Sequence, residues 1–448
     1  MISRQGPLDA AKSICYMILV LPCQQTHRGP AVALGPASLC VGVRPKMPVL
    51  PFLLPFGLLQ SSVGRPSFFA SCVKGVEQVL ATELSTAVIG AEDVQVGHLG
   101  VHFSGTLDVG ARAVLWSRTA LRVMEVIDIV DDVHDAESLY DVARAVEWAD
   151  YLAGPSQTIS VQAVLGAQRA TDNGRMRPGD WSCGSCGANV FASKMACFRC
   201  GAAKPREGER GGALTHSHFS ALTVKNAVCD RLRDQFGTRP SVDADDADLP
   251  LFLHVHRGRA SLYRVLSGGA SMHKRGYRTG SSVHAAALRE TLAAAMLLHA
   301  GYDPAVDVLC DPMAGSGTIP IEAALIAQRI APGLLRPPPA LTRWPDFDMR
   351  SWAAATEEAE GMRLERAPCP ILGNDWHPGA SELASRAASA AGVVPSIAWQ
   401  QSDAYVSSGL EYMQTPLPSP RPLPTARILC DLTCLGLDLI DLNGLELT

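Results

Sequence analysis

The sequence lacks three features that would each point to a broad class of protein. It has no basic excess, because 39 Lys and Arg are set against 44 Asp and Glu and the net charge is −5. A cationic surface over the whole chain is thus excluded, and any nucleic-acid contact must use local patches. No apolar run near the N-terminus approaches the roughly 20 residues that cross a bilayer. Most of the 13 Cys are scattered, which argues against a disulfide framework and for a reducing compartment.

Residues 1–66 are poor in acids. They hold six Lys or Arg and a single acid, Asp9. This basic, Pro-containing composition suits a disordered segment or an organelle transit peptide, with the chloroplast favoured over the mitochondrion. The alternative is a misplaced start, with translation beginning at Met47 or later and the protein remaining in the cytoplasm.

The next 200 residues alternate between strand and helix patterns. Residues 67–129 predict a small α+β domain of ferredoxin-like type. Residues 130–266 predict a second α+β unit, which ends in a strand pair at Leu251–Arg257 and Ala260–Leu266. Its pattern stops at Ala167 and resumes at Leu214, so a separate unit interrupts it.

The interruption contains two CxxC pairs separated by ten residues. Four thiolates at this spacing predict a tetrahedral zinc site in residues 178–206. A closed set of four Cys leaves no position for water, so the metal should be structural. A segment this short has almost no core, and metal binding must supply most of its folding energy. The predicted ligands are Cys183, Cys186, Cys197 and Cys200.

A strand, a turn of small residues and a helix follow one another in the second half of the chain. Val306–Cys310 predicts a buried strand, Asp311–Thr318 (DPMAGSGT) the turn, and Ile319–Ile330 the helix. Gly315 and Gly317 lack a Cβ and let the backbone pass close to a ligand at the helix N-terminus. No Lys follows them, which excludes a phosphate-binding P-loop.

Further strands end in acids. Ile371–Asn374 is followed by Asp375, and a strand near Trp399 is followed by Asp403. In doubly wound folds an acid at the second strand accepts hydrogen bonds from ribose hydroxyls. Ala426–Cys430 predicts a fourth strand.

The DPMAGSGT string resembles the S-adenosylmethionine loop of methyltransferases that act on exocyclic amines of nucleic-acid bases. Ala331–Leu334 (APGL), Arg343–Asp348 (RWPDFD) and His273–Arg278 (HKRGYR) are similar to the bacterial-type methyltransferases of guanine N2 in large-subunit ribosomal RNA. The resemblance implies a Rossmann-like domain over residues 267–448. It also implies a cofactor site made of Asp311, Pro312, Gly315, Ser316, Gly317 and Thr318 for the methionine end, Asp375 for the ribose and Asp403 for the adenine.

The same family places Asn/Asp-Pro-Pro-aromatic after the fourth strand, where it accepts hydrogens from the amine and stacks on the flipped base. Here Asp431 is the one candidate for that catalytic role, with no prolines and no aromatic after it. We therefore expect a domain that is incomplete after residue 431, with weak cofactor binding and no methyl transfer by residues 1–448. The alternative function is a non-catalytic RNA-binding protein.

Two further resemblances point to RNA. Phe219–Ala227 (FSALTVKNA) is similar to the THUMP domain, an RNA-binding module, and Trp181 before the first CxxC is similar to Ran-binding-protein-type zinc fingers. Gly187-Ala188 stands where ubiquitin-binding fingers carry Thr-Phe, so ubiquitin is not expected, and no membrane partner is expected. The fold class is therefore multidomain, α/β and α+β, and the partner is ribosomal RNA. The residues predicted to contact RNA are Phe191, Lys194, Arg199, Lys225, Lys274 and Arg275.

Overall fold

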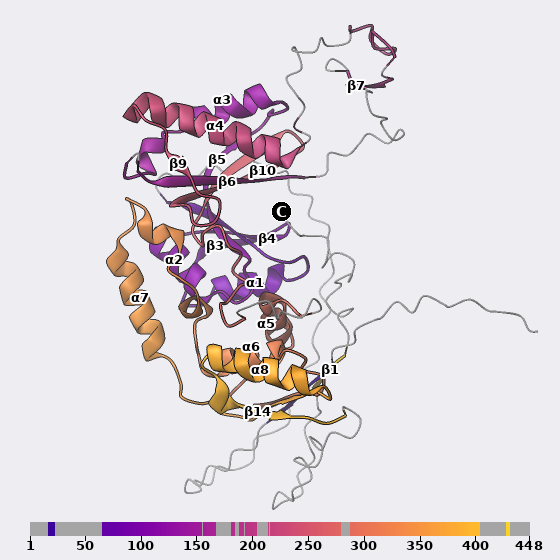
Figure 1. Ribbon diagram of the computed structural model, residues 1–448, viewed down its shortest axis with the longest axis vertical. Helices are drawn as coiled ribbons and strands as arrows, with labels where there is room; N and C mark the ends of the chain where they lie inside the picture. The colour runs from indigo at the N-terminus through magenta and orange to yellow at the C-terminus, as the bar shows by residue number, and fades with distance from the viewer. Residues whose placement is uncertain are drawn as a thin grey trace, which may run out of the picture.

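The computed structural model describes residues 17–22, 65–154, 156–166, 181–183, 188–191, 193–203, 214, 216–278, 287–403 and 427–430. These residues form an eight-stranded sheet, a five-stranded sheet and a two-stranded sheet, with helices packed around the first two (Figure 1). Among them, no helix has the length and apolar character needed to cross a membrane.

The eight-stranded sheet has the strand order β3-β4-β2-β5-β11-β10-β6-β9. The two predicted α+β units share this one sheet, because β5 and β11 pair antiparallel from Met124 opposite Val265 to Val130 opposite Ala260. The strand patterns did not predict this joint. The strands are β2 (Ser67–Ser71), β3 (Glu92–Gly97), β4 (Gly100–Ser104), β5 (Arg122–Val130), β6 (Thr158–Leu165), β9 (Ser241–Val242), β10 (Leu249–His256) and β11 (Arg259–Val265).

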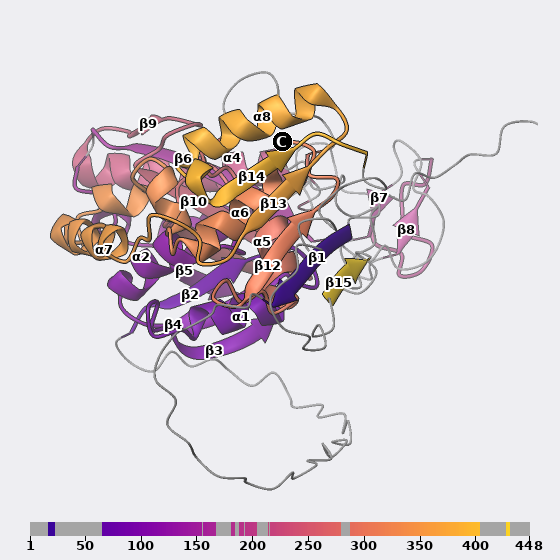
Figure 2. The ribbon, with the colours of Figure 1, turned by 90° about the horizontal axis from the view of Figure 1, so that it is seen from below.

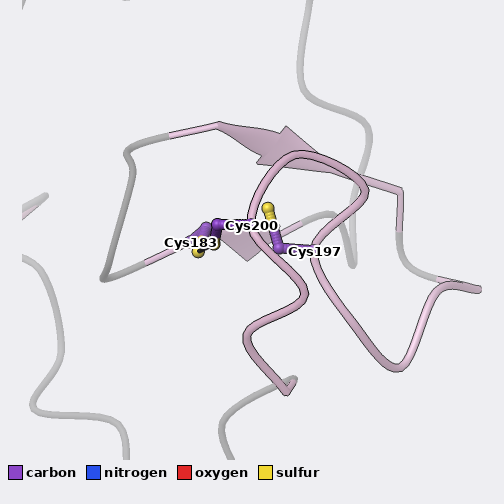
Figure 3. A group of neighbouring side chains, drawn as sticks. All are labelled: Cys183, Cys197 and Cys200. Atoms are coloured by element: carbon purple, nitrogen blue, oxygen red, sulfur yellow. Dashed lines mark hydrogen bonds between the residues drawn. The ribbon is translucent and has the colours of Figure 1, made fainter.

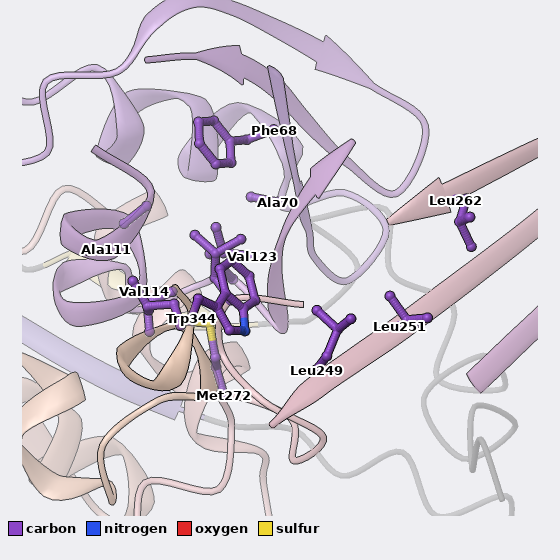
Figure 4. Close-up of a cluster of buried hydrophobic side chains, with 14 of the residues drawn as sticks. Phe68, Ala70, Ala111, Val114, Val123, Leu249, Leu251, Leu262, Met272 and Trp344 are labelled. Atoms are coloured by element: carbon purple, nitrogen blue, oxygen red, sulfur yellow. The ribbon is translucent and has the colours of Figure 1, made fainter. Parts of the chain in front are cut away.

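Helices cover one face of this sheet. In Figure 1, α3 and α4 lie together over one end and α1 and α2 over the other. Alternating residues such as Phe68, Ala70 and Leu251 point into the core beneath the helices (Figure 4). The intervening residues form the opposite face. The helices are α1 (Glu77–Leu84), α2 (Leu107–Trp116), α3 (Ala136–Ala145) and α4 (Ser217–Phe236).

The five-stranded sheet has the order β14-β13-β12-β1-β15 and is seen in Figure 2. β12 (Asp307–Asp311), β13 (Ile371–Asn374) and β14 (Ile397–Gln400) are parallel. β1 (Met17–Pro22) lies antiparallel between β12 and β15 (Arg427–Cys430). The sequence pattern did not predict β1, because its partners are remote in the chain.

Helices α5 (Glu290–His299), α6 (Thr318–Ala327) and α8 (Pro378–Ala390) accompany the parallel strands. The residues of α5 from Glu290 to Leu297 are all buried. This helix is therefore enclosed by its neighbours, which include α6 and α1, and does not present one face to solvent.

The segment between α6 and β13 links the two large sheets through side-chain contacts. It contains the short helices η2 (Pro332–Leu335) and η3 (Ala340–Arg343), and α7 (Met349–Gly361). Arg264 of β11 donates to both carboxylate oxygens of Asp346 and lies 4.1 Å from the ring centre of Trp344. Arg264 also donates to Glu125 at 2.6 Å. The RWPDFD string therefore holds the parallel-strand domain against the eight-stranded sheet.

The two-stranded sheet pairs β7 (Trp181–Ser182) with β8 (Asn189–Val190). Its buried cluster consists of Cys183, Val190 and Cys197. A core of three side chains is too small to fold a segment without another source of stability.

Candidate functional site

The carboxyl ends of β12, β13 and β14 meet at one edge of the parallel sheet. Asp311 ends β12, Asp375 follows β13, and Asp403 follows β14. Asp311 is 3% exposed, Asp375 is half-buried and Asp403 is exposed. The edge thus presents acids of different accessibility beside the loop that enters α6, which is where doubly wound sheets bind ligands.

The loop between β12 and α6 depends on its glycines. Gly315 and Gly317 both have left-handed backbones, with φ of 53° and 77°. A Cβ at Gly317 would lie 2.6 Å from Trp399 and 2.9 Å from Ala384, so this glycine is needed for packing. A Cβ at Gly315 would meet no atom within 4 Å. The loop is therefore tight on its inner side and open at Gly315.

Asp375 joins the second strand to this loop. Its Oδ2 accepts the Gly315 N–H at 2.9 Å, and its Oδ1 accepts the His377 N–H at 2.9 Å. Each carboxylate oxygen has a further lone pair, so Asp375 can still accept hydrogen bonds from ligand hydroxyls. The neighbouring Trp376 is 74% exposed and offers an aromatic face beside it.

Asn374 is a positioning residue that the strand-end reasoning missed. It is buried, donates to the Pro312 and Ser402 carbonyl oxygens at 3.1 and 3.0 Å, and accepts the Ser402 hydroxyl at 2.8 Å. One amide therefore ties together the ends of all three parallel strands. The signal in the sequence was a polar residue, Asn374, at the end of the otherwise apolar strand Ile371–Asn374.

Burial makes the Asp311 carboxyl a weaker acid than an exposed Asp. Burial raises the pKa of Asp311 to about 7; the Met313 N–H opposes the rise, and the charge of Asp375 adds to it. Its carboxyl accepts the Met313 N–H at 3.2 Å. Near neutral pH this group can therefore be neutral or anionic, and a cationic ligand group nearby would favour the anion.

We predict that Asp311→Asn stabilises the ligand-free protein in a pH-dependent way. The raised pKa means that the unfolded chain loses the Asp311 proton from about pH 4, whereas the folded chain keeps it until about pH 7. The wild type therefore loses stability as pH rises through this window, and Asn does not. The advantage of Asp311→Asn should grow by about 2–3 kcal/mol between pH 5 and pH 8. Denaturant unfolding at both pH values measures it, and an advantage that does not change with pH contradicts it.

Three of the predicted metal ligands lie together. The Sγ atoms of Cys183, Cys197 and Cys200 are all within 4.8 Å of one another (Figure 3), and Cys183 and Cys200 are 3.4 Å apart. Ligand sulfurs around tetrahedral zinc are separated by about 3.8 Å, so this spacing fits the ion. Cys186 and the candidate catalytic residue Asp431 lie outside the described residues.

The residues predicted to contact RNA fall into two groups. Phe191 is 64% exposed, Lys194, Arg199 and Lys274 are exposed, and Lys225 is half-buried on α4. These side chains can be reached from solvent. Arg275 cannot.

Arg275 requires a correction. Its side chain has no exposed surface, and its guanidinium lies 3.4 Å from the equally buried Glu322 carboxylate. Arg275 also donates to the Arg118 and Met272 carbonyl oxygens. Its donors are directed inward, so it cannot contact an RNA phosphate in this structure. The basic run HKRGYR contributes Lys274 to the surface, while Arg275 joins α6 to the loop after α2.

Four family models match this chain. An RMKL-like methyltransferase domain covers residues 275–411, an RlmL ferredoxin-like domain covers 67–124, and a THUMP domain covers 211–265. A zinc finger of the kind found in Ran-binding protein and others covers 177–206. The described fold is mixed α/β and contains ferredoxin-like, THUMP and methyltransferase domains.

Curated relatives agree with these models. The ribosomal RNA large subunit methyltransferase K/L of Syntrophotalea carbinolica is 37% identical over 311 residues, which are 68% of this chain and 36% of that protein. A protein of Synechocystis named "Putative RNA methyltransferase slr0064" is 32% identical over 315 residues, 70% of this chain and 68% of that protein. The chain thus spans about a third of the first relative and two thirds of the second.

A solved structure has the same arrangement. The crystal structure of a predicted N6-adenine-specific DNA methylase from Listeria monocytogenes superposes with a TM-score of 0.58 at 27% identity. The match covers 76% of this chain and 75% of that chain.

Proposed function

Since the chain belongs to the family of THUMP-containing RNA methyltransferases with an RMKL-like methyltransferase domain, we propose that it transfers a methyl group from S-adenosylmethionine to guanine N2 of large-subunit ribosomal RNA. The observation that carries the proposal is the edge where Asp375 accepts the Gly315 N–H beside buried Asp311. The names of the K/L relatives support ribosomal RNA as the substrate. Guanine N2 comes from the resemblance of the APGL and RWPDFD strings.

The residues of the edge fit the cofactor. Open space at Gly315 would accommodate its methionine end, the half-buried Asp375 would accept hydrogen bonds from the ribose hydroxyls, and the exposed Asp403 would bind the adenine amine. When bound, S-adenosylmethionine supplies an activated methyl group on a sulfonium. The protein contributes orientation, because holding the acceptor nitrogen in line with the methyl group lowers the barrier. We propose Asp431 as the hydrogen-bond acceptor for the amine.

The small cysteine domain completes the RNA-binding part. We propose that Cys183, Cys186, Cys197 and Cys200 hold one structural zinc ion, which leaves Phe191 free to stack on an RNA base beside Lys194 and Arg199. Lys225 and Lys274 would add phosphate contacts.

A transfer assay tests the acceptor. The chain is incubated with methyl-tritiated S-adenosylmethionine and unmodified large-subunit ribosomal RNA, and the RNA is digested to nucleosides. Label in N2-methylguanosine supports the acceptor and contradicts the expectation, drawn from the sequence around Asp431, that residues 1–448 transfer no methyl group. Label in another nucleoside overturns the acceptor. Absence of label, in a protein that binds both cofactor and RNA, overturns methyl transfer and leaves the non-catalytic RNA-binding alternative.

A further inference from the structure

Strand β1 lies at the point where the strand order of the five-stranded sheet reverses. The parallel strands follow one another outward from β12 to β13 and β14, and the chain then returns to the other side of β12 for β15. In a doubly wound sheet the first and fourth strands pair at this point, and the ligand lies in the crevice at their carboxyl ends. Here β1 lies beside β12, and β15 is one strand farther out (Figure 2).

Strand β1 runs opposite to its neighbours. It is antiparallel to both β12 and β15, so β12 and β15 are parallel to each other, as the first and fourth strands of a doubly wound sheet are. An antiparallel strand in an otherwise parallel sheet usually lies at its edge. Among the described elements, β1 has extensive contacts with β12 and β15 alone, whereas β12 and β13 also pack against α6. Removal of β1 thus leaves four parallel strands that can pair directly.

The register gives the size of the separation between β12 and β15. Leu19 pairs with Cys310 on one side and with Ile428 on the other, so these three residues form one row across the sheet. Neighbouring strands lie about 4.8 Å apart, which puts β15 about 10 Å from β12 instead of about 5 Å.

This separation affects the edge where the cofactor is proposed to bind. β15 ends at Cys430, which pairs with Met17 and lies two residues beyond that row, at the same edge as Asp311. The proposed acceptor of the amine, Asp431, is the next residue in the sequence. A misplacement of about 1 Å can lower the rate of a positioned reaction about 100-fold. A strand moved outward by about 5 Å therefore holds its carboxyl end too far from the cofactor for efficient transfer.

We propose that residues 17–22 form an autoinhibitory strand, and that methyl transfer requires its release from between β12 and β15. Release breaks two strand pairings, and direct pairing of β12 with β15 replaces one of them. The blocked form is therefore favoured until the segment is removed. The acid-poor composition of residues 1–66 suits a transit peptide, and its cleavage beyond Pro22 would remove β1. The proposal rests on the proposed function, because it names the regulation of the same site.

A disulfide that locks β1 in place tests both its position and its role. Leu19 and Cys310 are directly opposite in antiparallel strands, where Cα atoms lie about 4.5–5.5 Å apart and a disulfide fits. We expect Leu19→Cys to crosslink to Cys310 on mild oxidation, detected as linked peptides by mass spectrometry. The oxidised protein should transfer the methyl group about 10-fold more slowly than the reduced protein. The matched control is Ile18→Cys, because Ile18 pairs with Leu429, and it should show neither effect.

Breaking the strand should have the opposite effect. Leu19→Pro removes an N–H from the pairing and disrupts an interior strand, so it should release β1 and transfer the methyl group about 10-fold faster than the wild type. Leu19→Val keeps the N–H and a high strand propensity, so this matched control should behave as the wild type does. S-adenosylhomocysteine should bind all three proteins equally, because β12, β13 and β14 keep their pairing.

Hydrogen exchange separates release of β1 from unfolding. If β15 pairs with β12 after release, the amides of Arg427–Cys430 stay protected in Leu19→Pro. Loss of that protection shows that β1 is a structural strand and overturns the proposal, as does the absence of a crosslink between Leu19→Cys and Cys310.

The rates distinguish this strand from the methyl-transfer proposal. Equal transfer by the wild type, Leu19→Pro and oxidised Leu19→Cys overturns the inhibitory role and leaves the proposed function intact. No transfer by any of them overturns the proposed function and, with it, an inhibitory role for β1.

Discussion

Replacing Cys197 with serine is expected to release zinc and unfold the segment around β7 and β8, while the eight-stranded sheet stays folded. The cluster of Cys183, Val190 and Cys197 is separate from the core under α1–α4. Metal binding supplies about 10–16 kcal/mol of apparent free energy to structural zinc sites in isolated finger peptides, far more than three buried side chains can contribute. Elemental analysis should fall from one zinc per chain to nearly none, and limited proteolysis should cut within residues 178–206.

The matched control is Phe198→Ser. Phe198 lies between two of the cysteines and is 72% exposed, so this variant should retain zinc and resist cleavage. Full zinc content in Cys197→Ser, or loss of the α/β core together with the metal, would contradict the account of an independent metal-folded unit.

The variant Arg275→Met is expected to lower the free energy of unfolding by about 3–5 kcal/mol, because it leaves a buried carboxylate without its cation. Glu322 has no exposed surface, and its Oε1 also accepts the Tyr277 hydroxyl at 3.0 Å. Arg275 further donates to the Arg118 carbonyl, and Arg118 donates to Ile330 at 2.9 Å. The loss should therefore loosen the contact between α6 and the loop after α2 as well. Denaturant unfolding measures the change.

Two variants make this prediction specific. Lys274→Met removes the neighbouring exposed cation and should change stability by less than about 0.5 kcal/mol, while weakening RNA binding. The double variant Arg275→Met/Glu322→Leu removes both charges and should recover part of the lost stability. A single variant as stable as the wild type would show that the pair is not buried in solution.

The candidate site shows which features local patterns can predict. An apolar strand followed by an acid, and glycines before an apolar helix, are local signals, and the structure forms β12, the glycine loop and α6 from them. Parallel pairing then brings Asp311 and Asp375 to one edge, as strand topology requires. The CxxC spacing is also a local signal. It predicted a metal site, and the structure brings the Sγ atoms of three of the four cysteines together.

Features that depend on distant partners were not predictable. Arg275 and Lys274 are adjacent and basic. Arg275 is buried because it pairs with Glu322, whereas Lys274 is exposed to solvent. The hydrogen bonds of Asn374 likewise follow from which strands become neighbours. Composition and spacing carry no information on such pairings, because they are fixed by tertiary packing.

Isothermal titration of the chain with S-adenosylhomocysteine, the product form of the cofactor, tests the central claim most directly. The account predicts one saturable site per chain, with affinity at least 10-fold weaker in Asp375→Asn, whose amide cannot reproduce both hydrogen bonds from Gly315 and His377. Arg386→Gln should bind as the wild type does. A folded wild type that shows no saturable binding, or an Asp375→Asn variant that binds equally well, would contradict a cofactor site at the ends of β12, β13 and β14.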